Sequence, residues 1–336
     1  MNVTRIYVPR ETTSISVGAD EVAVAIAREA KQSGAAIQLV RNGSWGACWL
    51  EPLVEVEVDG VRIAYRNVEA DDVPGLFAAG LLEGDDHAKR LGPVSEVPYL
   101  ISQDRWTFWR CGLTEALSLD DFLLHQGFKA LQKAWDMGAD AVIDAVTESG
   151  LRGRGGAGFP AGIKWRTVAD AEGEQKYIAC NADEGDSGTF SDRMLMEGDP
   201  FGLIEALAIA GFAVGANKGY IYLRSEYPLT NTILSRAIDT AREAGWLGAD
   251  IQGSGFDFDI ELHLGAGSYV CGEETAMLES LEGKKGIVRY KPPLPAHEGL
   301  FGKPTVVNNV VTLASVPNII NLGGERYAGM GVNRSK

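Results

Sequence analysis

Between residues 177 and 281, short apolar runs alternate with helical patterns, and this alternation restricts the possible folds most strongly. The runs at 177–180, 219–223 and 256–264 indicate buried strands. Helical patterns at 200–216 and 229–243 lie between them. Strands that alternate with helices form parallel βαβ units, whose ligands bind beyond the carboxyl ends of the strands. We therefore expect a Rossmann-like α/β domain in this part of the chain.

A glycine-rich segment, GLRGRGGAGFPAGIKW at 150–165, precedes the first of these strands. Five glycines and two arginines fall within its first nine residues, and Lys164 follows. Glycine lets backbone N–H groups approach a ligand closely, and cationic side chains attract anions. In a chain with a formal net charge of −15, this group of cations predicts a phosphate-binding loop.

The loop admits more than one interpretation. Residues 153–158 fit the G-x-G-x-x-G dinucleotide pattern, which requires a strand before it and a helix directly after it. The preceding segment, 139–149, has helical spacing, and Phe159-Pro160 suits a loop better than a helix. These neighbours argue against a standard Rossmann phosphate loop. We favour a phosphate loop of another architecture over an ordinary surface loop.

Polar loops follow two of the predicted strands. NADEGD at 181–186 follows the first, and GAGSYVCGEE at 265–274 follows the third. Each has an ordinary structural explanation, because Asn, Asp and Gly favour turns and acids favour the first turn of a helix. A proline-rich segment at 291–309 is expected to be a stiff loop that contributes Asn308 and Asn309. Together the three segments predict one ligand site.

The composition excludes several classes of protein. The acidic balance argues against a nucleic-acid partner. The start of the chain lacks the apolar run of a signal peptide, and the longest apolar stretch, 203–216, is too short for a bilayer. We expect a cytoplasmic protein without direct membrane insertion. The four cysteines and four histidines show no metal-ligand spacing, so no metal site is expected in this chain.

The first part of the chain predicts a separate small domain. Strands are expected near 5–8, 37–41, 54–58 and 61–65, with helices at 20–33 and 72–80. This order is typical of a thioredoxin-like domain. We predict that it occupies residues 1–105, including a linker at 81–105. The α/β domain would follow at 106–322, and 323–336 would begin a further, truncated domain.

Residues 44–48, SWGAC, followed by Pro52 and Val54, give this domain a more specific resemblance. They resemble the second ligand pair of the thioredoxin-like 2Fe-2S ferredoxin domains that accompany NADH dehydrogenases. Only Cys48 remains of that pair, Ser44 stands in place of its partner, and residues 9–18 contain no counterpart of the first pair. Because such a cluster needs about four thiolates, we expect this domain to hold none and to serve as a docking platform.

The segments from about residue 117 to 322 closely resemble the NADH-binding flavoprotein subunit of respiratory complex I. The same module occurs as the diaphorase subunit of NAD-reducing hydrogenases and NAD-dependent formate dehydrogenases. The resemblance implies FMN and NAD as cofactors. It implies an FMN phosphate side formed by Gly153, Arg154, Gly155, Gly156 and Lys164. Ribityl or isoalloxazine contacts would come from Asn181, Asp183, Glu184, Gly272, Glu273, Asn308 and Asn309.

NADH would face Phe159, Lys164, Asp186, Tyr269 and Glu274. Leu294 stands where an aromatic residue is common, which predicts weaker stacking of the adenine. No catalytic side chain is expected, because hydride passes between the two cofactors. The carboxylates of Asp186 and Glu274 could bond ribose hydroxyls and would repel a 2′-phosphate, so we expect a preference for NAD over NADP.

The fusion to a cluster-free thioredoxin-like domain most resembles the β subunit of soluble NAD-dependent formate dehydrogenase. The expected function is therefore that of an FMN-containing NADH dehydrogenase (diaphorase) module. Its partners would be an iron–sulfur γ-type subunit and a large catalytic subunit. The alternatives are a hydrogenase diaphorase or complex I subunit, a flavin-free Rossmann dehydrogenase and a non-catalytic scaffold. The family's four-cysteine 4Fe-4S segment would follow Lys336, so that cluster is expected only in a missing C-terminal segment.

Overall fold

The computed structural model describes residues 3–186 and 188–331. Its contacts divide the described chain into two compact units. Unit 1 comprises the residues up to Ser118 together with Glu197–Asp199, and unit 2 comprises the rest. Residues 106–118 thus group with unit 1, although the sequence assigned them to the second domain. Residues 323–331 group with unit 2, and the remainder of the predicted third segment lies outside the described residues.

Unit 1 has the thioredoxin-like topology that the sequence predicts. Its strands are β1 (Thr4–Tyr7), β2 (Ile37–Val40), β3 (Val54–Val58), β4 (Val61–Tyr65) and β5 (Arg90–Pro93). They form one sheet in the order β2-β1-β3-β4-β5, in which only β1 and β2 are parallel. The β3–β4 turn places Asp59 and Gly60 at positive φ, as a type I′ hairpin requires.

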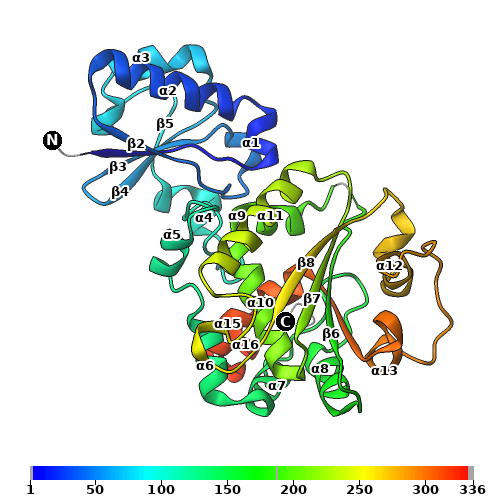
Figure 1. The fold of residues 1–336 in the computed structure, drawn as a ribbon. Coiled ribbons are helices and arrows are strands. Elements are labelled where there is room, and N and C mark those ends of the chain that lie inside the picture. Colours follow the sequence, from blue (N-terminus) through cyan, green and yellow to red (C-terminus); the bar gives the residue numbers. More distant parts are fainter. Residues whose placement is uncertain (1–2, 187, 332–336) are drawn as a thin grey trace. The chain divides into compact units, whose positions relative to one another are not determined.

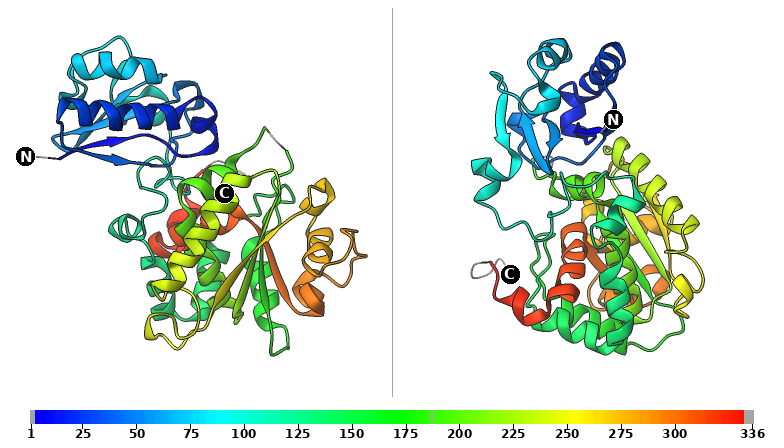
Figure 2. Two further views of the ribbon diagram at one scale, coloured as in Figure 1. Left: turned by 45° about the horizontal axis from the view of Figure 1, so that its top comes forward. Right: turned by 90° about the vertical axis from the view of Figure 1, so that its left-hand side faces the viewer.

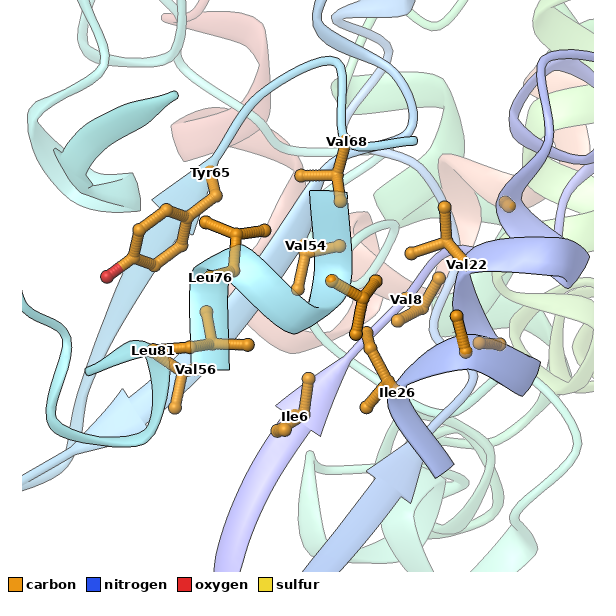
Figure 3. Close-up of a cluster of buried hydrophobic side chains, with 14 of the residues drawn as sticks. Ile6, Val8, Val22, Ile26, Val54, Val56, Tyr65, Val68, Leu76 and Leu81 are labelled. Atoms are coloured by element: carbon orange, nitrogen blue, oxygen red, sulfur yellow. The ribbon is translucent and has the colours of Figure 1, made fainter. Parts of the chain in front are cut away.

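The core of unit 1 lies between this sheet and its helices. Helix α2 (Ala19–Ser33) begins and ends at glycines of positive φ, and α3 (Val73–Ala78) packs beside it. Figure 3 shows the apolar side chains that these elements bury together, among them Ile6, Val8, Val22, Ile26, Val54, Val56, Val68 and Leu76. Burial of such side chains contributes about 1.5–3 kcal/mol each, so unit 1 has a core of its own.

The ferredoxin-like positions of unit 1 form a hydrogen-bond network. The Ser44 hydroxyl donates to Oε1 of Glu51 (2.8 Å), and the Leu53 N–H donates to Oε2 (2.9 Å). Burial raises the pKa of Glu51 to about 7, and the nearby Glu11 carboxylate also raises it. Within the described residues, no three His, Cys, Asp or Glu side chains are arranged to hold a metal ion. The absence of an iron–sulfur cluster stays a prediction.

Unit 2 contains an entirely parallel sheet. Its strands are β6 (Tyr177–Ala182), β7 (Lys218–Leu223), β8 (Asp259–Leu264) and β9 (Thr305–Asn309), in the order β8-β7-β6-β9. The first three are the predicted strands, although β8 begins at Asp259 and not at Phe256. Strand β9 corrects the expectation of a stiff loop, because its five residues pair along β6.

Helices cover both faces of this sheet (Figures 1 and 2). Helix α10 (Pro200–Val214) lies on one face and is buried at nearly every position, whereas α12 (Glu274–Leu281) packs on the other against Ala179, Tyr222 and Val307. The remaining α-helices of the described residues are α1 (Thr12–Ser16), α4 (Pro98–Ile101), α5 (Leu119–Leu124), α6 (Lys129–Met137), α7 (Ala139–Glu148), α8 (Ala161–Asp170), α9 (Ser191–Gly198), α11 (Pro228–Glu243), α13 (Pro295–Glu298), α14 (Val310–Ala314), α15 (Val316–Leu322) and α16 (Gly324–Ala328). Among the described residues, no helix has the length and apolar character needed to cross a membrane.

The strand order creates a switch point beside β6. From β6 the chain proceeds to β7 and then β8 on one side, and it returns to β9 on the other side. The connections therefore diverge between the carboxyl ends of β6 and β9. In open α/β sheets a crevice forms at such a point, and Asn181, Asn308 and Asn309 lie there.

Candidate functional site

A cavity of about 510 Å³ lies at the switch point of unit 2. Its lining comes from the glycine-rich loop, α8, the ends of β6 and β9, and the segments 272–274 and 291–296. Small-molecule sites typically have volumes of roughly 300–1,000 Å³. Ten predicted site residues line it: Gly153, Gly155, Phe159, Lys164, Asn181, Gly272, Glu273, Glu274, Asn308 and Asn309. The carboxyl ends of β6 and β9 thus gather most of the predicted residues at one cavity.

The glycine-rich segment forms a closed loop between two helices. Arg152 and Pro160 form an antiparallel bridge, and the Gly153 N–H donates to the Phe159 carbonyl (2.9 Å). Helix α7 precedes the loop, as predicted, so the loop lacks the preceding strand of a Rossmann phosphate loop. Helix α8 begins directly after Pro160, where the sequence favoured a loop. Proline's fixed φ is compatible with a helix start.

The loop approaches α14 closely. The Arg154 N–H donates to the Thr312 hydroxyl (2.8 Å), and a Cβ on Gly155 would lie 3.2 Å from Cβ of Asn309. Gly156 has a φ of +106°, which side chains rarely adopt. Arg154 and Gly156 belong to the loop, but they do not line the cavity. The absence of a side chain at 155 lets the loop rest against β9.

Three asparagine side chains at the strand ends are held by hydrogen bonds within unit 2. Asn181 donates to the Gly272 carbonyl (2.8 Å) and accepts from the Asp183 N–H (3.1 Å). Asn308 accepts from the Trp165 indole (2.9 Å). Asn309 caps α14 by accepting from the N–H groups of the next turn. These amides are therefore oriented before any ligand arrives.

Four charged side chains form a network at the cavity. Lys291 donates to Glu273 (2.9 Å) and Glu274 (2.7 Å), and Lys164 lies 3.7 Å from Glu274. Lys164 also donates to the Val307 carbonyl (2.7 Å), and burial lowers its pKa. Burial would lower the pKa of Lys291 too, but hydrogen bonds from Lys291 to Glu274 and Glu273 outweigh it and raise the pKa. The network thus holds two ammonium groups at the cavity.

Asp183 and Glu184 lie beside the cavity without lining it. The Glu184 carboxylate accepts from the Asp192 and Arg193 N–H groups at the start of α9 (3.0 and 3.2 Å) and from the Tyr227 hydroxyl (3.0 Å). Asp183 has a buried Oδ2 without a hydrogen-bond partner among the described residues. This atom lies close to Gly272, and burial raises the pKa of Asp183 to about 6. Glu184 serves as a helix cap, whereas one buried oxygen of Asp183 has no hydrogen-bond partner among the described residues.

Asp186 and Tyr269 are exposed and lie outside the cavity lining. The Tyr269 ring packs over Gly185, where a Cβ would come within 2.6 Å of it. The cavity also has lining residues that were not predicted, including Thr167, Lys291, Thr305 and Val307. Thr167 follows Lys164 by three positions, a spacing that shares one helix face. Thr305, Val307 and Asn309 are spaced two residues apart and so share one face of β9. This spacing indicates a common site only if the segment is recognised as a strand.

Comparison with known proteins identifies the fold around this cavity. Residues 146–318 match the family model described as the Nuo51 FMN-binding domain. The chain belongs to this family of complex I flavoproteins. The matched segment contains the glycine loop, the four strands of unit 2 and all residues that line the cavity.

Two curated relatives show the same relationship. The chain is 53% identical over 226 residues to the HndC component of the NADP-reducing hydrogenase of Solidesulfovibrio fructosivorans, a match that covers 67% of this chain and 46% of the relative. It is 53% identical over 214 residues to a component of the NADH-quinone oxidoreductase of Aquifex aeolicus, covering 64% of this chain and 50% of that one. The chain thus spans about half the length of the curated relatives it matches.

The chain is also similar to a solved structure of an NAD⁺-reducing [NiFe]-hydrogenase in the air-oxidised state. The similarity covers 96% of this chain and 53% of the hydrogenase chain. The sequence identity is 29% and the TM-score is 0.55. This similarity extends beyond the FMN-binding segment and includes residues of unit 1.

Proposed function

We propose that this chain is an FMN-binding module that exchanges hydride between NAD(H) and FMN within a multi-subunit electron-transfer complex. The observation that carries the proposal is the cavity at the β6–β9 switch point, which the glycine loop and Lys164 line in a member of the FMN-binding family. Bound flavin would supply the hydride acceptor. The protein then has to bind and orient the flavin and the nicotinamide and to exclude water from them.

The residues at the cavity fit FMN. Gly153 and Gly155 give the loop a surface without side chains, and Lys164 adds a cation. These are features that a phosphate group requires. The orphaned Oδ2 of Asp183 beside Gly272 suits a flavin or ribityl donor. We propose that Asn181, Gly272, Glu273, Asn308 and Asn309 line the rest of the flavin site, with Arg154, Gly156 and Glu184 supporting it.

For NADH we propose contacts with Phe159, Lys164 and Glu274, which line the cavity, and with the exposed Asp186 and Tyr269. Phe159 is 48% exposed and offers an aromatic face to a planar ligand. The carboxylate of Glu274 can accept a hydrogen bond from a ribose hydroxyl, and Lys291 fixes its position.

For the whole complex we propose an NAD-dependent formate dehydrogenase in the cytoplasm, with an iron–sulfur γ-type subunit and a large catalytic subunit. Its support is the thioredoxin-like unit, in which Ser44 stands in place of one cysteine of the ferredoxin-like pair and donates to Glu51. We propose that electrons leave through a 4Fe-4S cluster outside the described residues. A NAD-reducing hydrogenase is the second candidate, because similarity to the hydrogenase structure covers both units.

The test begins with the full chain and FMN. We expect one flavin per chain in a fluorescence titration and NADH-dependent reduction of ferricyanide by the loaded protein. A chain that binds no flavin refutes the proposal. A flavin-loaded chain without activity favours a scaffold role. Isolation of the native complex then separates the two candidates: formate-driven NAD reduction supports the first, and hydrogen-driven reduction supports the second.

A further inference from the structure

Asp192, in the first turn of α9, is a buried carboxylate that the proposed function does not use. The residue is 4% exposed, and Oδ2 accepts a hydrogen bond from Nδ2 of Asn309 (2.7 Å). The Val311 N–H also interacts with it. Burial raises the pKa of Asp192 to about 7, and the neighbouring Glu184 carboxylate also raises it. Burying a carboxyl group is costly unless it forms hydrogen bonds. The residues that bond Asp192, on β9 and α14, therefore indicate its structural role.

Both the oxygen and the NH₂ group of the Asn309 side-chain amide form hydrogen bonds. Its oxygen accepts from the N–H groups of Val311 (2.9 Å) and Thr312 (3.3 Å) and thereby caps α14. The NH₂ group consequently points to Asp192. Oδ2 of Asp192 accepts from this NH₂ group and so supports this orientation of the amide. Asn309 lines the cavity in that orientation.

The network continues from Asn309 to the glycine loop. The Thr312 hydroxyl accepts from the Arg154 N–H (2.8 Å), and Gly155 lies against Cβ of Asn309. The loop therefore contacts Asn309, which bonds Asp192, and Thr312, whose N–H bonds Asn309. Glu184, the other acid in this region, bonds the backbone of α9 and Tyr227.

We propose that Asp192 is a positioning residue, which holds the glycine loop in its ligand-binding conformation through Asn309 and the start of α14. This inference rests on the proposed function, because the ligand that benefits is the flavin phosphate. The inference goes beyond that function because Asp192, which would hold the conformation of the glycine loop, does not itself line the cavity.

The first experiment compares Asp192→Ala with Asp192→Asn in the full chain. Both variants remove the charge, but only asparagine keeps an oxygen that can accept from Asn309, so their difference reports the hydrogen bond. Loss of one such bond predicts a Kd for FMN about tenfold weaker in Asp192→Ala than in Asp192→Asn. A fluorescence titration measures both values. If Asp192→Ala does not fold, Asp192→Leu replaces it, because leucine fills the space without an acceptor.

A buried acid elsewhere in unit 2 provides the control. Glu205 accepts from the Ala130 N–H (2.9 Å) and the Leu131 N–H (3.1 Å) at the start of α6. Glu205→Ala should lower the unfolding temperature and leave the Kd for FMN unchanged. A Kd that weakens equally in this variant would show that any loss of stability weakens binding, and would overturn the inference.

The second experiment requires no ligand. Amide hydrogen exchange at residues 150–160 and 309–313 should be faster in Asp192→Ala than in Asp192→Asn. Equal exchange in the two variants overturns the inference, as does an equal Kd where the wild-type chain binds FMN. If the wild-type chain binds no FMN, the proposed function fails, and the exchange result still decides whether Asp192 positions the loop.

Discussion

Lys164 joins the two parts of the candidate site. Its ammonium group donates to Val307 on β9 and faces Glu274 beside the glycine loop. We expect Lys164→Gln to weaken FMN binding about tenfold or more, since hydrogen bonds to charged groups contribute about 1.5–3 kcal/mol. Lys176→Gln is the matched control, because Lys176 also donates to a backbone carbonyl, that of Ala169, and does not line the cavity. Fluorescence titrations of both variants measure the difference. Equal Kd values would exclude Lys164 from the phosphate site.

Glu274 is expected to set the choice between NAD and NADP. Its carboxylate lines the cavity and is held by Lys291, and it would repel a 2′-phosphate by like charge. We expect kcat/KM for NADH to exceed that for NADPH by about tenfold or more. Glu274→Gln should narrow this ratio. Steady-state kinetics with both nucleotides test it, with Glu261→Gln on β8 as the control. One relative is named as NADP-reducing, so the opposite preference is a real alternative. A wild-type ratio of kcat/KM for NADH to that for NADPH near one would contradict the prediction.

At the scale of elements, the α7–α8 contact places Lys164 and Trp165. A Cβ on Gly162 would lie 2.2 Å from the Thr147 hydroxyl and 2.7 Å from its Cα. Gly162→Ala should therefore separate the helices and destabilise unit 2 by about 1–3 kcal/mol. Gly75→Ala in α3 is the control, since its Cβ would meet nothing within 4 Å, and alanine favours a helix. Denaturant unfolding measures both. Equal stability of Gly162→Ala and the wild type would show that the helices can move apart without cost.

The sequence predicted the elements whose patterns are local. The three strands 177–180, 219–223 and 256–264 and the helix before the glycine loop correspond to β6, β7, β8 and α7. It missed β9, because TVVNN is short and follows prolines that suggested a loop. Pairing along β6 makes this segment a strand, and pairing between residues far apart in sequence leaves no local signal.

The candidate site shows the same limit. Glycines and asparagines at strand ends were predictable, because turns and strand ends place them at one edge. The direction of individual side chains was not. Asp183 and Glu184 are adjacent, yet one has an orphaned oxygen and the other caps α9. Thr167 and Lys291 line the cavity through helix and loop geometry that the sequence did not specify.

At the scale of the whole molecule, the chain combines two different units. Unit 2 has a candidate cofactor cavity, whereas unit 1 keeps only Cys48 of the cysteines that would hold an iron–sulfur cluster. Ser44 donates to Glu51 where a ligand pair would otherwise begin. We expect iron and sulfide to be absent from the purified chain, and reconstitution with both to add no visible absorption beyond that of flavin. A 2Fe-2S spectrum after reconstitution would contradict this prediction and would assign electron transfer to unit 1.

Glu51 should make the stability of unit 1 depend on pH. Burial raises its pKa from 4.5 to about 7 in the folded chain, so between these values the folded state binds more protons than the unfolded state. The stability of unit 1 must then fall as pH rises through this window and level off above it, by about 3 kcal/mol in total. Glu51→Gln removes the titration and should remove this slope.

Hydrogen exchange at the core amides of β1 and β3 measures the opening free energy of unit 1 within the full chain. The wild type should lose protection as pH rises from about 4.5 to about 7 and show no further loss above that, whereas Glu51→Gln should keep its protection. Glu21→Gln, on the exposed face of α2, should retain the wild-type slope. If Glu51→Gln and the wild type show parallel curves, the burial of Glu51 does not govern the pH response. The polar network at the ferredoxin-like position would then be stable in either protonation state, and its acid would act only as a hydrogen-bond acceptor for Ser44 and Leu53.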